Sequence, residues 1–106
     1  MPVKNPHTSM EINDLLRDAR AIWGNDKLTL PQVLVRLGVD YGDLCRYERH
    51  ADKDRETHTD EALKKQLGNI IFSMIRWCDD LGFDPEECIE MAKASQKRFV
   101  KTNKMR

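Results

Sequence analysis

The sequence predicts an all-α fold, a four-helix bundle, on three observations. Apolar residues recur at helical spacing in four segments, and no segment alternates apolar and polar residues as a half-buried strand does. Residues that favour helix starts and ends bound these segments. The chain has 106 residues, enough for a single domain with one hydrophobic core. Within that domain, we expect polar, frayed ends at about residues 1–7 and 102–106.

The first two helices are predicted from their start signals. The first is expected to begin near Thr8, where the segment to Glu11 resembles a capping box, and to end at about Gly24. The second begins at Thr29, with a proline in its first turn, and runs to about His50. Their apolar stripes are Met10, Leu15, Ala19, Ile22 and Trp23, and then Val33, Leu37, Leu44 and Tyr47.

A charged segment over residues 51–59 has no apolar residue after its first position, and it predicts a loop. The third helix is expected from about Asp60 to Leu81, with Gly82 as its cap, and Asp84-Pro85 then starts the fourth. Their apolar stripes are Leu63, Leu67, Ile70, Met74, Trp77 and Leu81, and then Cys88, Ile89, Ala92, Phe99 and Val100. Stripes this wide leave apolar surface to cover, so we expect the chain to self-associate as a homo-oligomer, with Leu63, Phe72, Met74 and Trp77 in the core or the interface.

Composition argues against several classes of partner. Eighteen basic and eighteen acidic residues give a formal net charge of zero, so bulk charge indicates no nucleic-acid polymer. No apolar run approaches the ~18 residues that cross a bilayer, so no membrane partner is expected. The N-terminus is polar and indicates no signal peptide. Three scattered cysteines without CxxC spacing are typical of free thiols in a reducing compartment, and they predict a cytoplasmic protein.

Two short motifs are the candidate chemical site. Asp40 and Asp43 lie three residues apart on the second predicted helix, and Gln66 and Asn69 have the same spacing on the third. Each motif has a glycine before its second member, which costs a helix roughly 1 kcal/mol. We interpret the glycines as places where the backbone can come close to a neighbour or a ligand, in a shared site where the two helices meet. Hard cations such as Mg²⁺ prefer oxygen ligands of these types. Alternatively, the aspartates are half-exposed surface acids and the amides make ordinary hydrogen bonds.

These motifs resemble those of a known family. Residues 34–44, LVRLGVDYGDL, are similar to the first signature of the MazG-type nucleoside triphosphate pyrophosphohydrolases, K-L-x-E-E-x-G-E-L. Residues 65–72, KQLGNIIF, resemble the second, E-L-G-D-V-L-F, and residues 81–87, LGFDPEE, resemble the L-G-I-D-L-E-E link before the last helix. The resemblance covers about residues 30–99. It implies a helical bundle, usually a dimer or tetramer, that cleaves nucleoside triphosphates to monophosphate and pyrophosphate with magnesium.

The resemblance also assigns roles, and the departures from it weaken them. It implies that Asp40 and Asp43 are catalytic and that they hold Mg²⁺, or Mn²⁺, together with Gln66 and Asn69. The family's E-E-x-x-E is here Val39-Asp40-Tyr41-Gly42-Asp43, and its E-x-x-D is Gln66-x-x-Asn69. The first glutamate is lost, and of the four carboxylates that hold metal in the family, two remain as acids. Two hypotheses follow: a pyrophosphohydrolase of weakened activity, or a non-catalytic relative that acts as a nucleotide-binding or oligomeric interaction module.

Other residues are candidates for binding the nucleotide. Arg36 takes the place of the lysine in the first signature, and Lys93, Lys97 and Arg98 fall where family members bind phosphate. Trp23 is a candidate for stacking on the base, as are Tyr41 and Trp77. The alternatives are a solvated basic helix face and tryptophans of the core.

Two further features are interpreted as having no chemical role. Cys45 has no histidine placed to activate it, so we expect an inert, partly buried thiol. Asp79 and Asp80 are adjacent on a helix and point about 100° apart, so we expect acids that face solvent.

Overall fold

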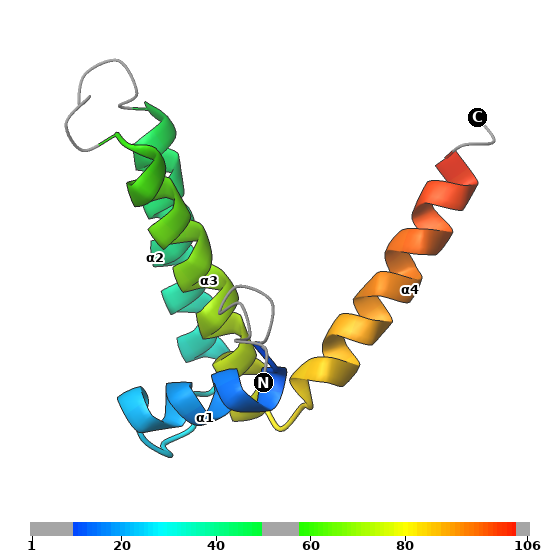
Figure 1. Ribbon diagram of the computed structural model, residues 1–106, viewed down its shortest axis with the longest axis horizontal. Helices are drawn as coiled ribbons and strands as arrows, with labels where there is room; N and C mark the ends of the chain where they lie inside the picture. Colours follow the sequence, from blue (N-terminus) through cyan, green and yellow to red (C-terminus); the bar gives the residue numbers. More distant parts are fainter. Residues whose placement is uncertain (1–9, 50–57, 104–106) are drawn as a thin grey trace, which may run out of the picture.

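The described part of the chain folds into four helices. The computed structural model describes residues 10–49 and 58–103, and these ranges contain no strand. The helices are α1 (Ile12–Trp23), α2 (Leu30–Arg49), α3 (Asp60–Asp80) and α4 (Pro85–Asn103) (Figure 1). The predicted all-α class is confirmed. None of these four helices combines the length and the apolar character that a membrane span requires.

The start of α1 differs from its prediction. The helix begins at Ile12, and Met10 precedes it. Glu11 occupies the N-cap position in an extended conformation, without a side-chain capping bond; the predicted cap, Thr8, lies outside the described residues. At the other end, Gly24 has a φ of +84° and its N–H donates to the carbonyl of Arg20 at 2.8 Å. The predicted end of this helix at about Gly24 is therefore confirmed.

The starts of α2 and α3 follow from local capping. The backbone N–H of Thr29 donates to Oε1 of Gln32 at 2.9 Å, and the carbonyl of Thr29 accepts the N–H of Val33. Thr59 caps α3, because its Oγ1 accepts the N–H of Ala62 at 3.1 Å. These contacts satisfy N–H groups that a helix start otherwise leaves unpaired. Most of the predicted loop, residues 50–57, lies outside the described residues.

The turn between α3 and α4 uses the residues that the sequence indicated. Gly82 has a φ of +85°, in the left-handed region that favours glycine. The N–H of Phe83 donates to the carbonyl of Cys78 at 2.9 Å, which closes the end of α3. Asp84 then starts α4, because its Oδ1 accepts the N–H of Glu86 at 3.0 Å. Proline follows Asp84 as the first residue of α4, where its lack of an N–H costs nothing.

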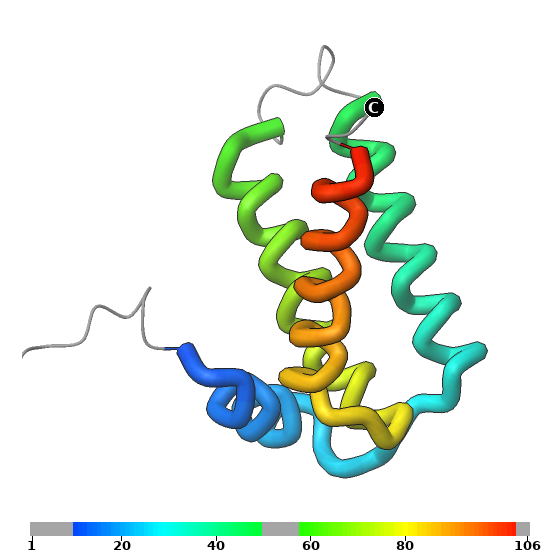
Figure 2. Tube along the Cα trace, turned by 90° about the vertical axis from the view of Figure 1, so that its right-hand side faces the viewer, coloured from blue at the N-terminus to red at the C-terminus, as the bar shows by residue number. Residues whose placement is uncertain are grey.

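The helices form an open arrangement. α2 and α3 lie side by side and antiparallel, since Asp40 contacts Asn69 and Tyr47 contacts Thr59. α1 packs across the end of α3 (Figures 1 and 2). α4 leans away from α2 and α3 beyond the turn that joins it to α3 (Figure 1). The radius of gyration is 17.0 Å, against about 13 Å for a compact domain of this length.

The core lies where α1, α2 and α3 meet. Its buried apolar side chains among the described residues are Ala19, Val33, Ile75 and Trp77, of which Trp77 is 2% exposed. Of the other core or interface candidates, Leu63 and Phe72 are half-buried and Met74 is exposed. The expected stripe of α4 is not buried within the chain, because every residue from 89 to 102 is exposed. The tilt of α4 away from α3 leaves that stripe without a neighbour.

Candidate functional site

The two predicted motifs face each other across α2 and α3. Nδ2 of Asn69 donates a hydrogen bond to Oδ1 of Asp40 at 3.3 Å. Asp40 lies in the middle of α2 and is half-buried, whereas Asn69 is exposed. The antiparallel pairing brings residue 40 opposite residue 69, as the sequence predicted. This contact is the geometric link between the motifs.

The outer members of the motifs are less closely joined. Asp43 lies 3.6 Å from the guanidinium of Arg46, one turn further along α2. Gln66 is half-buried, and its Nε2 has no hydrogen-bond partner within residues 10–49 and 58–103. An amide in this state has hydrogen-bonding capacity to spare for a ligand. The structure therefore joins Asp40 with Asn69 directly and leaves Asp43 and Gln66 at the edges of the site.

The chemistry of this donor set fits an oxygen-preferring cation, but weakly. Asp40 and Asp43 offer carboxylates, and the two amides offer carbonyl oxygens. Asn69 directs its nitrogen toward Asp40, so a half-turn of its amide is needed before its oxygen faces the site. Among residues 10–49 and 58–103, no group of three or more histidine, cysteine, aspartate or glutamate side chains is placed to hold a metal ion. Two carboxylates carry half the charge of the four that the resemblance implies.

In the described part of the chain, no neighbour approaches the motif glycines, so that part of their predicted role is wrong, while the approach of a ligand stays a prediction. A Cβ atom added at Gly42 or at Gly68 would meet nothing within 4 Å. Neither glycine therefore marks a close approach of α2 and α3. Each glycine is about 100° around its helix from the polar residue that follows it, so it points to one side when that residue faces the other helix.

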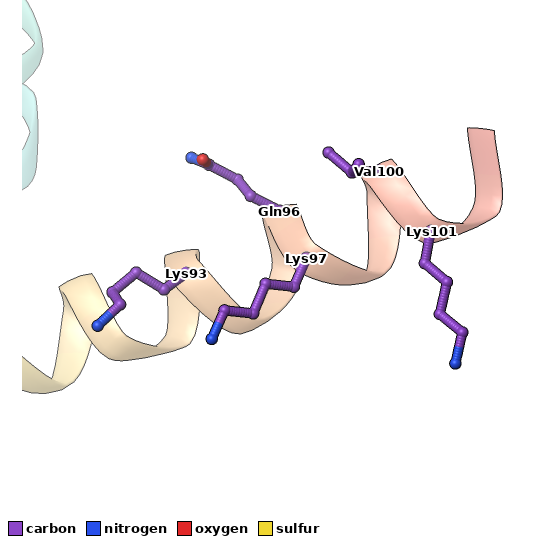
Figure 3. A pocket seen from close by; sticks show the side chains of 5 residues that line it. All are labelled: Lys93, Gln96, Lys97, Val100 and Lys101. Carbon is purple, nitrogen blue, oxygen red and sulfur yellow. The ribbon is translucent and has the colours of Figure 1, made fainter. Parts of the chain in front are cut away.

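The phosphate-binding candidates fall in two separate places. Arg36 is exposed on α2, one turn before Asp40, beside a shallow hollow of about 420 Å³. Lys93 and Lys97 line another hollow, of about 520 Å³, on the outer part of α4 (Figure 3). Arg98 is exposed on the same helix. Because α4 leans away from α2, one chain does not bring these three residues to Asp40 (Figure 1).

The aromatic candidates also differ in their surroundings. Trp23 is exposed, and the guanidinium carbon of Arg76 lies 4.6 Å from the centre of its ring. One face of that ring is thus engaged in a cation–π contact. Trp77 is a core residue, whereas Tyr41 is exposed on α2.

An ion-pair network at the junction of α1 and α3 was not predicted. One guanidinium nitrogen of Arg20 contacts Oδ2 of Asp79 at 2.5 Å and Oδ1 of Asp80 at 2.6 Å. The expectation that both acids face solvent is wrong, because the side chain of Asp80 is 0% exposed. Nε of Arg76, four residues earlier on α3, lies 3.9 Å from Oδ2 of Asp80. The network fastens α1 to the end of α3.

Neighbouring charges and burial both shift the pKa values of the two arginines, and the net shift is upward for Arg20 and downward for Arg76. The hydrogen bond to Asp79 raises the pKa of Arg20, although partial burial opposes it. Burial lowers the pKa of Arg76, and Arg36 and Arg20 add to that effect as like charges, while Asp80 opposes it. Since arginines neutralise both acids, this cluster is not free to bind a metal. A sequence signal existed: Asp80 lies three residues after Trp77, so it continues the apolar stripe of α3.

The cysteines are free thiols, as predicted. Cys45 is exposed, which corrects the expectation of a partly buried thiol. Cys78 and Cys88 are half-buried on either side of the turn between α3 and α4. Burial, with a hydrogen bond to Cys88, raises the pKa of Cys78 to about 11.

Comparison with known proteins gives no further assignment: no family model matches the chain, and no curated protein or solved structure is detectably similar to it.

Proposed function

We propose that the chain is a cytoplasmic, homo-oligomeric nucleotide pyrophosphohydrolase of MazG-like type, with weakened activity on nucleoside triphosphates. The observation that carries this proposal is the contact between Asp40 and Asn69, which joins the two motifs across α2 and α3. Oxygen-bearing side chains from two facing helices are the basis of such a site, and Arg36 stands one turn away for a phosphate.

The weakness follows from the donor set. A bound Mg²⁺ or Mn²⁺ would offset negative charge on the phosphates, with Asp40, Asp43, Gln66 and Asn69 as its ligands. Only the two aspartates bring negative charge, and Asp40 already accepts a hydrogen bond from Asn69. A cation must therefore compete with that hydrogen bond for a site of low charge. We expect slow turnover and weak metal binding.

The test is to restore both lost acids. We expect the variant carrying Gln66→Glu and Asn69→Asp to release pyrophosphate at least ~10 times faster than wild type in magnesium, since ~1.4 kcal/mol of transition-state stabilisation gives that factor. The assay covers the common nucleoside triphosphates, with Mg²⁺ and Mn²⁺ compared. A folded double variant that is no faster than wild type would contradict the weakened-enzyme proposal. Brisk turnover by wild type would instead show that the amides do not impair the site.

Metal binding can be measured apart from turnover. A cation that binds the folded state raises its melting temperature, and we expect a small rise with Mn²⁺ and less with Mg²⁺. Asp40→Asn should abolish that rise. If the rise persists in this variant, the cation binds elsewhere. The double variant should also be slightly less stable than wild type without metal, because four clustered carboxylates repel one another.

One observation favours a second candidate, a non-catalytic nucleotide-binding or interaction module. The described residues hold no cluster of acids around Asp40, and Asn69 satisfies Asp40 without a cation. This candidate predicts that nucleoside triphosphates raise the melting temperature while no pyrophosphate is released, even with the two acids restored. Arg36→Ala should then reduce the shift caused by nucleotide.

A further inference from the structure

The inner faces of α3 and α4 are apolar and uncovered. On α3, the exposed residues Leu67, Ile71 and Met74 lie within about 60° of one another around the helix. Cys78 continues this stripe and meets Cys88 of α4. The stripe therefore turns into the angle that α3 makes with α4 (Figure 1). Ile71 is 65% exposed, an unusual state for an isoleucine in a repeated apolar stripe.

The face of α4 beside that angle is apolar as well. Phe99 is 68% exposed and Val100 is 50% exposed, and Ile89 and Ala92 extend their stripe toward the start of the helix. An isolated helix of this kind gains little from its own hydrogen bonds in water, and most helical stability comes from packing of the apolar face. Among the described residues, the apolar faces that α3 and α4 turn toward the angle between them therefore lack a neighbour, although the opposite side of α3 packs against α1 and α2.

The charges of α4 indicate what that neighbour is. Every charged residue before Lys93 is acidic, namely Glu86, Glu87 and Glu90, and every charged residue from Lys93 onward is basic, namely Lys93, Lys97, Arg98 and Lys101. A helix with this division attracts a copy of itself that runs antiparallel, and repels a parallel copy. The net charge of zero adds no overall repulsion between two chains.

One flank of the α4 stripe carries this complementarity in register. Glu86, Glu90, Lys97 and Lys101 lie within about 60° of one another around the helix, beside the apolar stripe. If two antiparallel copies of α4 cross near Ala94, Glu90 falls close to Lys97 of the second copy, and Glu86 close to Lys101. The same crossing places Ile89 near Phe99 and Val100 of the second copy, so one register satisfies both the charged and the apolar side chains.

The exposed area is sufficient for such an interface. The accessible surface is 9021 Å², whereas a compact monomer of this mass exposes about 6,100 Å². The difference is roughly 2,900 Å², and it counts the whole chain rather than the described residues alone. It exceeds the ~800 Å² that each partner buries in an interface of standard size.

We propose that α4 of one chain inserts into the angle between α3 and α4 of a second copy, with the two α4 helices antiparallel. Each α4 then covers Leu67, Ile71 and Met74 of the other chain as well as its α4 stripe. The partner is a second copy of this chain, and the inference does not depend on the proposed nucleotide chemistry.

Charge reversal tests the pairing. One variant carries Glu86→Lys with Glu90→Lys, which makes all four residues of the charged flank of α4 basic. The other carries Lys97→Glu with Lys101→Glu, which makes all four acidic and leaves Lys93 as the basic residue beside that flank. In sedimentation velocity at 150 mM salt, we expect wild type to dimerise at micromolar concentration and each variant alone to dimerise at least tenfold more weakly. An equimolar mixture of the two variants should form a heterodimer with a Kd within about threefold of the wild-type value, because the reversed flanks attract again.

A matched control separates this pairing from a general effect of net charge. Glu87 and Arg98 lie on the side of α4 opposite the stripe, so Glu87→Lys and Arg98→Glu should leave the wild-type Kd unchanged. Far-ultraviolet circular dichroism confirms that each variant keeps its helices. A monomeric wild type at 100 µM would overturn the proposal. Equally, a wild-type dimer that both reversed variants retain, or a mixture that fails to recover dimerisation, would show that a different surface or a different partner covers α4.

Discussion

The junction of α1 with α3 and the outer part of α4 differ in whether the chain buries their amphipathic faces. At the junction, Trp77 is buried and Arg20 holds two aspartates, one of them fully buried. Along α4, every residue from 89 to 102 is exposed, although that segment also carries an apolar stripe. The difference shows that amphipathic spacing specifies a face to be buried, but not whether the same chain buries it.

Trp77→Ala against Phe99→Ala tests this difference most strongly. Loss of the buried indole should lower the free energy of unfolding by about 3–5 kcal/mol, at any protein concentration. Phe99 has no such cavity to leave within one chain, so its loss should matter only at concentrations where copies associate. Urea unfolding at two protein concentrations measures both effects. A large, concentration-independent loss for Phe99→Ala would mean that α4 packs against its own chain.

The ion-pair network should be the next most sensitive feature. Asp80→Ala removes a fully buried carboxylate and leaves the buried Arg76 without the acid that faces it, although Arg20 keeps Asp79, so we expect a loss of about 3–5 kcal/mol, as for broken buried ion pairs. Glu87→Gln is the matched change on α4, where an exposed acid sits in the first turn. It should cost less than about 1 kcal/mol. Equal losses in chemical denaturation would remove the distinction between the two regions.

Thiol reactivity measures how well the end of α3 is shielded from solvent at the point where α4 begins. At pH 8 a thiol with a pKa of about 11 holds far less thiolate than one at its ordinary value of 9.0. A thiolate of higher pKa is intrinsically more nucleophilic, which offsets part of this difference for Cys78. We therefore expect alkylation of Cys78 to be at least about tenfold slower than that of exposed Cys45. Iodoacetamide labelling with peptide mass spectrometry gives both rates in one sample. Similar rates would mean that the end of α3 is open to solvent.

The pKa of Cys78 also gives a direction for stability. The folded state holds this proton more tightly than the unfolded state, so its contribution to stability is present below pH 9 and is lost as the pH rises toward about 11. Cys78→Ala should remove that part of the pH dependence, and Cys45→Ala should leave it in place.

The smallest effects concern two glycines on α3 and its turn. Gly68 is exposed within the helix, and a Cβ there meets nothing, so Gly68→Ala should stabilise the fold by about 0.5–1 kcal/mol. Gly82 has a φ of +85°, so Gly82→Ala should destabilise it by about 1–2 kcal/mol. Thermal unfolding compares the two variants directly. Destabilisation by Gly68→Ala would indicate that a ligand or a second chain approaches that position.

The local sequence determined the four helices and most of their ends. Thr29 and Asp84 stand at the helix starts where the sequence predicted them, Thr59 caps α3 at the end of the predicted loop, and Gly24 and Gly82 end helices at positive φ. These features involve contacts over a few residues, so spacing and residue type suffice to predict them. The facing of Asp40 and Asn69 was also predictable, because two antiparallel helices with a known connection fix which residues lie opposite.

Only the tertiary structure decided the remainder. Asp79 and Asp80 looked like surface acids until α1 placed Arg20 against them, 59 and 60 residues away in sequence. The motif glycines proved to have open space around them, because helix rotation, which the sequence leaves free, turns them aside. The same holds for α4, whose residues specify an apolar face with acids at one end and bases at the other. Whether that face meets its own chain depends on the angle at Gly82, a backbone geometry that side-chain spacing does not encode.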